Sequence, residues 1–296
     1  MTRAHRNAAP RPHRYLRLGV VTAAAALAAA WAQPAPAAEP AKPTVQIKLL
    51  LDPAQVLTAD GTPLAGAGSA LRLGAASGTE AAEYLDSDSR QLHDQGWSVR
   101  VRHDDTDDQV KETYKKRYDI AGDGTDANAL ADALDRAADD SFDAGEDDYD
   151  AQVDLSYDKA TLDFSDGKKA DADGLGSGQL PSPADARDDV VHDLPGKLDD
   201  LGAKNFAKDV LAGAHIYGPV VQTDYPATVA GHTAELQVTP MRGTPADSPY
   251  WVELSADATT LAQAVALRGD LEDALDAHGW LLPENAFKTE QILASY

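Results

Sequence analysis

The sequence predicts an α+β fold built around a largely antiparallel β-sheet. Three observations lead to this prediction: several short segments alternate polar and apolar residues, helical patterns lie between them, and no regular strand–helix–strand rhythm recurs. Several of the predicted strands carry charges on one face and Val, Leu or Ile on the other. Such strands fit a flat sheet with a charged face in water, and they also fit a closed barrel with a polar lumen.

Residues 1–38 are predicted to be a secretory signal peptide, which leaves residues 39–296 as the folded domain. Residues 1–17 carry five Arg and no acid, residues 18–32 are an apolar run, and small residues suited to cleavage follow up to Ala38. A transmembrane helix needs about 20 apolar residues, and this run is shorter. We therefore expect a secreted, extracellular protein with a Sec-type signal.

The charge of the chain restricts its partners. The sequence has 49 acidic and 26 basic residues, and removing residues 1–38 takes away five bases and no acid, so 21 bases remain and the formal charge becomes −28. Nucleic acid and anionic membrane surfaces need a basic footprint, so neither is an expected partner. The absence of Cys excludes disulfides and thiol nucleophiles.

In the N-terminal half, period-two alternation predicts most of the elements. Residues 44–51 (TVQIKLLL) open the fold as a strand, and residues 52–78 are rich in Gly, Ala and Pro, as loops are. Two alternating segments around an Asp-rich turn predict a hairpin. Leu130 and Leu134 recur at helical spacing after Asp126, which is a suitable N-cap. The expected elements are a hairpin at 97–103 and 110–118, a helix at 126–142, and two short strands within 146–167.

In the C-terminal half, a Gly-rich and Pro-containing stretch at 166–184 predicts a flexible loop. Pro195 breaks the helical pattern of residues 182–214. Leu261, Val265, Leu271 and Leu275 form one apolar stripe that ends near Gly279, which predicts a helix. The remaining expected elements are a strand pair at 234–241 and 249–255, a helix at 259–278, and a closing strand at 288–293.

The hairpin carries a cluster of bases in an acidic chain. On its first strand Arg100 and Arg102 share one face, and on the returning strand Lys115 and Arg117 do the same. These four side chains, together with Lys48, are candidates for an anion-binding wall. The alternative is a solvated face on which each base pairs with a nearby acid, each pair contributing roughly 0.2–1 kcal/mol.

The order and residue patterns of these segments resemble those of the CYTH domains of the triphosphate tunnel metalloenzyme superfamily. YLDSDSRQLHDQGWSVRVR resembles the family segment in which a tyrosine and an aspartate precede a turn and a strand with Arg-x-Arg, and KETYKKRY resembles the next strand. AELQV, WVELS and KTEQIL resemble the acidic closing strands. The resemblance covers about residues 44–293. The chain also resembles secreted actinobacterial and fungal proteins with this domain.

The resemblance implies an antiparallel β-barrel, or tunnel, of about eight strands with flanking helices. It implies a triphosphate- or polyphosphate-type anion bound by the basic residues, and a divalent metal, Mg or Mn, bound by acidic ones. Members of the family hydrolyse triphosphates or cyclise ATP. Carried over to this chain, the residues that bind the anion would be Lys48, Arg100, Arg102, Lys115 and Arg117. The candidate metal ligands would be Asp154, Glu235, Glu253 and Glu290.

The chain departs from the family at several acidic positions. The first strand of the family reads Glu-x-Glu-x-Lys, and here Thr44 and Gln46 precede Lys48. Gln152 and Gln237 stand at further positions where a carboxylate is expected. An amide brings no charge to a metal, so enzymatic activity is an open question. Two hypotheses follow: an exported phosphohydrolase or phosphate-binding protein with the tunnel fold, and a catalytically decayed binding or structural module with the same fold. The Asp-rich turns lack a complete calcium-loop pattern.

Overall fold

The computed structural model describes residues 39–245 and 247–296. The signal peptide predicted for residues 1–38 lies outside the described residues, so export stays a prediction from the sequence. In the described part of the chain, every helix falls short of the length and apolarity that a membrane span requires.

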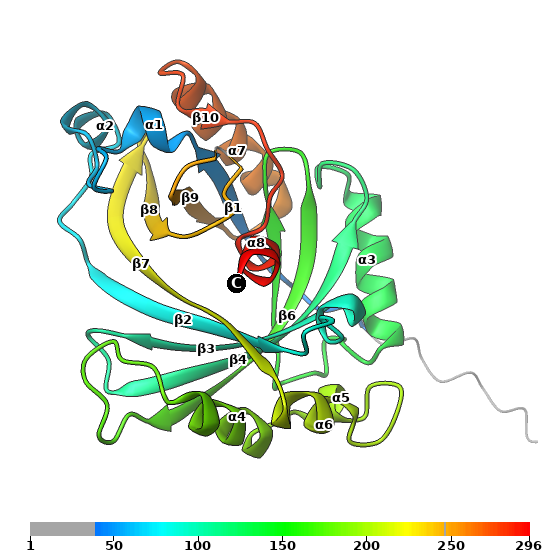
Figure 1. Ribbon diagram of the computed structural model, residues 1–296. Helices are drawn as coiled ribbons and strands as arrows, with labels where there is room; N and C mark the ends of the chain where they lie inside the picture. Colours follow the sequence, from blue (N-terminus) through cyan, green and yellow to red (C-terminus); the bar gives the residue numbers. More distant parts are fainter. Residues whose placement is uncertain (1–38, 246) are drawn as a thin grey trace, which may run out of the picture. The chain divides into compact units, whose positions relative to one another are not determined.

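Nine strands of the described residues close into a mixed β-barrel (Figure 1). Their order around the barrel is β1-β5-β6-β4-β3-β2-β7-β8-β9, and β1 closes the ring because it pairs with both β5 and β9. The β1–β5 pair is parallel, and the other pairs in the ring are antiparallel. The strands are β1 (Thr44–Leu51), β2 (Gly78–Asp86), β3 (Trp97–Asp104), β4 (Gln109–Ile120), β5 (Asp150–Leu155), β6 (Ala160–Asp171), β7 (His215–Val229), β8 (His232–Pro240) and β9 (Tyr250–Ala258).

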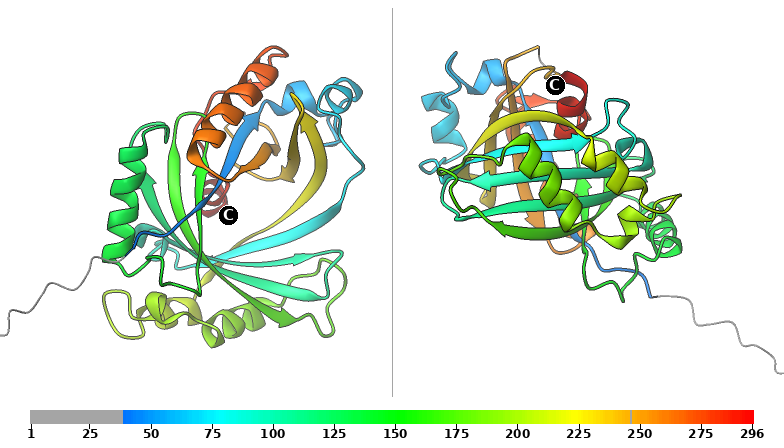
Figure 2. Two further views of the ribbon diagram at one scale, coloured as in Figure 1. Left: turned by 180° about the vertical axis from the view of Figure 1, so that it is seen from behind. Right: turned by 60° about the horizontal axis from the view of Figure 1, so that its bottom comes forward.

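Four of the helices in the described residues pack on the outside of the barrel wall. Helix α3 packs on β4 and β6, α4 on β3, α6 on β2, and α7 on β1 and β9. Figure 2 shows α4 lying across the outer face of the sheet. The helices are α1 (Pro53–Val56), α2 (Ala65–Ala70), α3 (Ala127–Asp139), α4 (Pro183–His192), α5 (Gly196–Asp199), α6 (Phe206–Ala212), α7 (Leu261–Asp276) and α8 (Lys288–Ser295). A 3₁₀ turn spans His93–Gln95, and the short β10 (Leu281–Leu282) pairs with β1.

The alternation of β3 places its apolar residues on the outer face of the barrel. Val99 and Val101 are buried there under α4, whereas Arg100 and Arg102 are half-buried and point inward. The main apolar core therefore lies between the barrel wall and the helices. This arrangement leaves the inner face of the wall to polar side chains.

The structure confirms the α+β class and the tunnel-like barrel, with nine strands in place of about eight. The closing strand predicted at 288–293 is wrong, because these residues form α8. Ile292 and Leu293 pack against Trp251 and Met241 inside one end of the barrel. Positions i, i+1, i+4 and i+5 share one face of a helix, so Lys288 and Thr289 point into the barrel beside Ile292 and Leu293.

Helix α8 lies inside the ring of strands (Figure 1), and its residues contribute to two different parts of the interior. At one end an apolar cluster surrounds Ile292 and includes Leu50, Tyr217, Val220 and Trp251. The other part is a polar cavity that begins at the first turn of α8. The fold therefore places Lys288 and Thr289 at the boundary between a packed apolar plug and a wet lumen.

Candidate functional site

The barrel encloses a cavity of about 360 Å³ whose lining is polar except for Tyr84 and Phe287. Charged groups from strands on all sides of the barrel and from α8 point into it. The bases are Lys48, Arg100, Arg102, Lys115, Arg117 and Lys288. The carboxylates are Glu80, Asp154, Asp224, Glu235 and Glu253, and the amides are Gln46, Gln152, Gln222 and Gln237.

The five bases predicted from the sequence share this one cavity. Ser98, Arg100 and Arg102 alternate along β3, and Thr113, Lys115 and Arg117 alternate along β4, so two neighbouring strands present their bases on the same face. Lys48 reaches the cavity from β1. The bases therefore face the interior of the barrel, and the pairing with nearby acids that the alternative interpretation predicts is found for Lys48, Arg102, Lys115 and Arg117.

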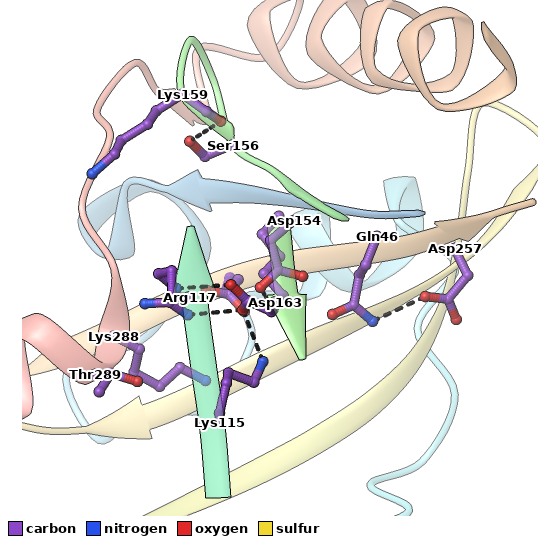
Figure 3. Close-up of polar contacts among 12 residues, drawn as sticks. Gln46, Lys115, Arg117, Asp154, Ser156, Lys159, Asp163, Asp257, Lys288 and Thr289 are labelled. Carbon is purple, nitrogen blue, oxygen red and sulfur yellow. Dashed lines mark hydrogen bonds and ion pairs between the residues drawn. The ribbon is translucent and has the colours of Figure 1, made fainter. Parts of the chain in front are cut away.

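Two of these bases share a carboxylate that the sequence analysis missed. Asp163 of β6 is completely buried and accepts hydrogen bonds from Lys115 Nζ at 2.9 Å and from Arg117 Nε and Nη2 at 3.0 Å each (Figure 3). Burial alone would raise the pKa of the Asp163 carboxyl, but these two cations hold it far below its usual range. Asp163 therefore stays ionised and neutralises part of the basic wall.

Two further bases have carboxylate partners of their own. Lys48 Nζ lies 2.6 Å from Asp154 Oδ2, and Arg102 Nη1 lies 3.1 Å from Glu80 Oε2. Burial opposes the charge of Lys48, but the charges of Asp154 and Glu253 and the hydrogen bond to Asp154 together outweigh it and raise the pKa of the Lys48 ammonium. With Asp163 counted, four of the six bases in the cavity are paired with a carboxylate inside the protein.

Arg100 and Lys288 differ from these four, since neither forms an ion pair with any described residue. Both lie near the Tyr84 hydroxyl, to which Thr289 Oγ1 donates a hydrogen bond at 3.4 Å. Burial opposes ionisation of Tyr84, but the charges of Arg100 and Lys288 lower the pKa of its hydroxyl below the usual value. These two bases therefore lack a direct carboxylate contact, although the charge of Glu80 acts on Arg100 and the charge of Lys288 acts on Asp224.

The sequence analysis missed Lys288 because it assigned residues 288–293 to a strand and considered only Glu290 there as a ligand. Lys288 Nζ lies 2.5 Å from Gln222 Oε1 and 3.1 Å from Gln237 Oε1. Glu290 does not join the cavity and lines a neighbouring pocket with Lys116 and Lys159. One helical turn thus contributes a base to the cavity and turns the predicted acid away from it.

Of the four candidate metal ligands, Asp154, Glu235 and Glu253 line the cavity. Each already accepts a hydrogen bond: Asp154 from Lys48, Glu235 from Gln237 Nε2 at 2.9 Å, and Glu253 from Trp251 Nε1 at 3.2 Å. Asp154 Oδ1 is buried without a hydrogen-bond partner.

Over residues 39–245 and 247–296, no group of three or more Asp, Glu or His side chains is placed to hold a metal ion, and this includes the Asp-rich turns. The carboxylates of the cavity, as arranged, therefore do not fit a metal centre.

Asp224 and Glu235 lie on neighbouring strands and repel each other. Burial, followed by the charge of Glu235, raises the pKa of the Asp224 carboxyl to about 6. Asp224 accepts a hydrogen bond from Gln222 Nε2 at 2.7 Å. This side of the cavity therefore carries negative charge that no described base pairs with directly.

Comparison with known proteins supports the fold. No protein-family model matches the chain, and no curated protein sequence does either. A solved structure of HpAC1 from Hippeastrum, a candidate adenylyl cyclase reported to have a dominant triphosphatase activity, matches with a TM-score of 0.50 at 14% identity over 84% of this chain and 94% of that one. A candidate adenylate cyclase from Bacillus halodurans matches with a TM-score of 0.45 at 11% identity over 84% of this chain and 97% of that one.

At 14% identity, the likeness to HpAC1 shows that the two chains share a fold. The barrel with its helices and the inward-facing bases of β3 and β4 are features that the resemblance to CYTH domains implies. The chain therefore has the fold of the CYTH domains of the triphosphate tunnel superfamily.

Proposed function

We propose that the cavity binds a triphosphate- or polyphosphate-type anion. The observation that carries this proposal is the pair Arg100 and Lys288, two cations without a carboxylate partner that face the same enclosed polar cavity. In a chain with a large excess of acidic residues, an anionic ligand would compensate these charges. The Tyr84 and Thr289 hydroxyls beside them supply hydrogen bonds that a phosphate oxygen can use.

The remaining bases would act on the same ligand. Phosphoryl groups carry their charge on several oxygens, and clustered Arg and Lys side chains stabilise that charge in a site that limits water. Arg102, Lys115 and Lys48 face the same cavity, each with a carboxylate partner of the protein beside it. The reported triphosphatase activity of HpAC1 supports the same class of ligand for this chain.

The proposal has a further step, in which the bound anion is hydrolysed with the help of a divalent metal ion, Mg or Mn. The residues available to hold the metal are Asp154, Glu235 and Glu253, and their present hydrogen bonds do not form a metal centre. We therefore derive no metal-dependent step from this arrangement. A phosphohydrolase of this type would have to release at least one of these carboxylates from its protein partner.

A second candidate function is a binding module that retains the fold without catalysis. Gln46, Gln152 and Gln237 line the cavity where the resemblance leads one to expect carboxylates, and an amide contributes no charge to a metal. Gln46 Nε2 is moreover hydrogen-bonded to Asp257 Oδ1 at 2.9 Å, which fixes an amide in that position (Figure 3). These amides favour binding without turnover.

One experiment separates the two candidates. Binding of inorganic triphosphate to the purified protein is measured by calorimetry in a chelator, and phosphate release is measured with added Mg or Mn. We expect binding that Arg100→Ala and Lys288→Met each weaken. Lys169→Ala, at an exposed site on β6, serves as the matched control and should bind like the wild type. Binding without turnover supports the non-catalytic module, whereas turnover lost in Arg100→Ala supports the hydrolase. No binding of triphosphate or pyrophosphate under any of these conditions refutes the proposed function.

A further inference from the structure

Lys288 is held in the cavity by two amides. Its Nζ donates to Gln222 Oε1 on β7 at 2.5 Å and to Gln237 Oε1 on β8 at 3.1 Å. Gln222 Nε2 donates in turn to Asp224, and Gln237 Nε2 donates to Glu235. The first turn of α8 is thereby tied to two neighbouring strands of the barrel wall.

The chemistry of these groups fixes the orientation of both amides. An ammonium group only donates hydrogen bonds, and an ionised carboxylate only accepts them. Each amide must therefore turn its oxygen toward Lys288 and its nitrogen toward the carboxylate, which is the arrangement observed. A flipped amide would place donor against donor and acceptor against acceptor.

The two amides hold Lys288 without a carboxylate in direct contact, although its charge and that of Asp224 act on each other across Gln222. A carboxylate partner cancels a unit charge, as Asp154 does for Lys48 and Asp163 does for Lys115. An amide oxygen supplies a dipole and no net charge. The Lys288 ammonium is therefore held in position by two neutral acceptors, and no direct ion pair with a described residue cancels its charge.

We propose that Gln222 and Gln237 are positioning residues for anion binding, which hold the Lys288 ammonium with neutral acceptors so that its charge acts on the bound anion. This inference rests on the proposed function, because it assumes that an anion occupies the cavity. It assigns a role to two amides at positions where the wall could have carried charged side chains.

The test compares Gln222→Glu and Gln237→Glu with the wild type. Each substitution keeps the shape of the side chain and places a carboxylate within hydrogen-bond distance of Lys288. We expect each variant to bind inorganic triphosphate at least about tenfold more weakly in a chelator, since a unit charge now cancels that of Lys288 at close range. Each variant also loses the amide donor to Asp224 or Glu235, so Gln222→Met and Gln237→Met, which lose the same donor without adding a charge, are measured beside it.

The comparison of charged with apolar variants identifies a positioning role. We expect Gln222→Met and Gln237→Met to lose less affinity than Gln222→Glu and Gln237→Glu, because they leave the charge of Lys288 uncancelled. If the apolar variants lose as much affinity as the charged ones at a similar Tm, the amides have a merely structural role and the inference is overturned. Gln152→Glu is the matched control, since it adds a carboxylate to the same cavity but Gln152 makes no hydrogen bond to Lys288. If Gln152→Glu weakens binding as much as Gln222→Glu and Gln237→Glu do, general repulsion explains the effect and the inference is refuted.

The failure of this inference can be told apart from the failure of the proposed function. If the wild-type protein binds neither triphosphate nor pyrophosphate, both are overturned. If the wild type binds triphosphate and Lys288→Met weakens binding, but Gln222→Glu and Gln237→Glu bind as tightly as the wild type, the anion site stands and only the positioning role is refuted.

Discussion

Arg117 and Asp163 form a two-pronged ion pair inside the barrel wall, with Arg117 Nε 3.0 Å from Asp163 Oδ1 and Arg117 Nη2 3.0 Å from Asp163 Oδ2. Lys115 shares the same carboxylate at 2.9 Å. Two cations that the sequence presents as an anion-binding wall are thus already held by an internal anion. The structure therefore separates the bases that build the wall from those left to a ligand.

We expect Asp163→Asn to destabilise the protein by about 3 kcal/mol at pH 7, because removing one partner of a buried ion pair leaves uncompensated charge. The pKa of Asp163 is lowered in the folded state, so its contribution is present above the usual value of 3.8 and is lost as the pH falls below it. Urea unfolding at pH 7 and pH 3 measures both effects. A variant as stable as the wild type at pH 7 would show that the pair contributes nothing.

Arg100→Ala should weaken metal-free triphosphate binding more than Arg102→Ala does. Arg102 is paired with Glu80, whereas Arg100 has no carboxylate partner among the described residues. A hydrogen bond to a charged group contributes roughly 1.5–3 kcal/mol, so we expect the Arg100 variant to lose about tenfold or more in affinity. Calorimetry at low salt, with Lys169→Ala as the control, measures the difference. Equal losses for both arginines would contradict this ranking.

Asp224→Asn should change the pH dependence of stability. Because burial and Glu235 raise the folded-state pKa of Asp224 to about 6, the wild type loses stability as the pH rises from about 4 to 6 and keeps that penalty above 6. The variant removes the penalty, so we expect it to be about 2 kcal/mol more stable at pH 7 and no more stable than the wild type at pH 4. Urea unfolding at the two pH values is the measurement.

The same substitution should strengthen anion binding at pH 7 more than at pH 5, since Asp224 becomes ionised over that range. The ratio of the two affinities, variant to wild type, cancels the titration of the ligand itself. A ratio that stays constant from pH 5 to pH 7 would contradict a pKa of about 6 for the Asp224 carboxyl.

Glu83→Gln should stabilise the protein at high pH. Glu83 lies on the outer face of β2, is 4% exposed, and has one carboxyl oxygen without a hydrogen-bond partner. Burial raises its pKa to about 7, against a smaller opposing effect of Arg187. Stability of the wild type should therefore fall as the pH rises from about 4.5 through 7, and the variant should gain about 2 kcal/mol at pH 8. Thermal unfolding from pH 4 to pH 8 tests this, and parallel profiles for the two proteins would refute it.

Local alternation was enough to predict the hairpin and the face on which its bases lie. The period of two along β3 and β4 fixes which side chains share a face, and this property does not depend on the rest of the fold. It could not reveal Asp163, because the pairing of β4 with β6 brings together residues far apart in the chain. The sequence around a carboxylate on a strand does not indicate which cation it will pair with in the folded protein.

Lys288 shows a different limit of sequence reasoning. Six residues that contain one apolar pair at their end fit a short strand as well as the first turns of a helix. The choice depends on the space between Trp251, Met241 and Val220, which Ile292 and Leu293 fill in α8. Since the strand assignment was wrong, the analysis selected Glu290 and overlooked Lys288, although both stand in the same segment.

The placement of the apolar core between wall and helices has an evolutionary consequence. Most of the free energy of folding is carried by residues such as Val99, Val101 and Phe164, which face away from the lumen or lie in the main core. The positions that face the lumen can then exchange acid for amide while the architecture persists. Substitutions there can change the chemistry of the cavity at little structural cost, and Gln46, Gln152 and Gln237 stand at such positions.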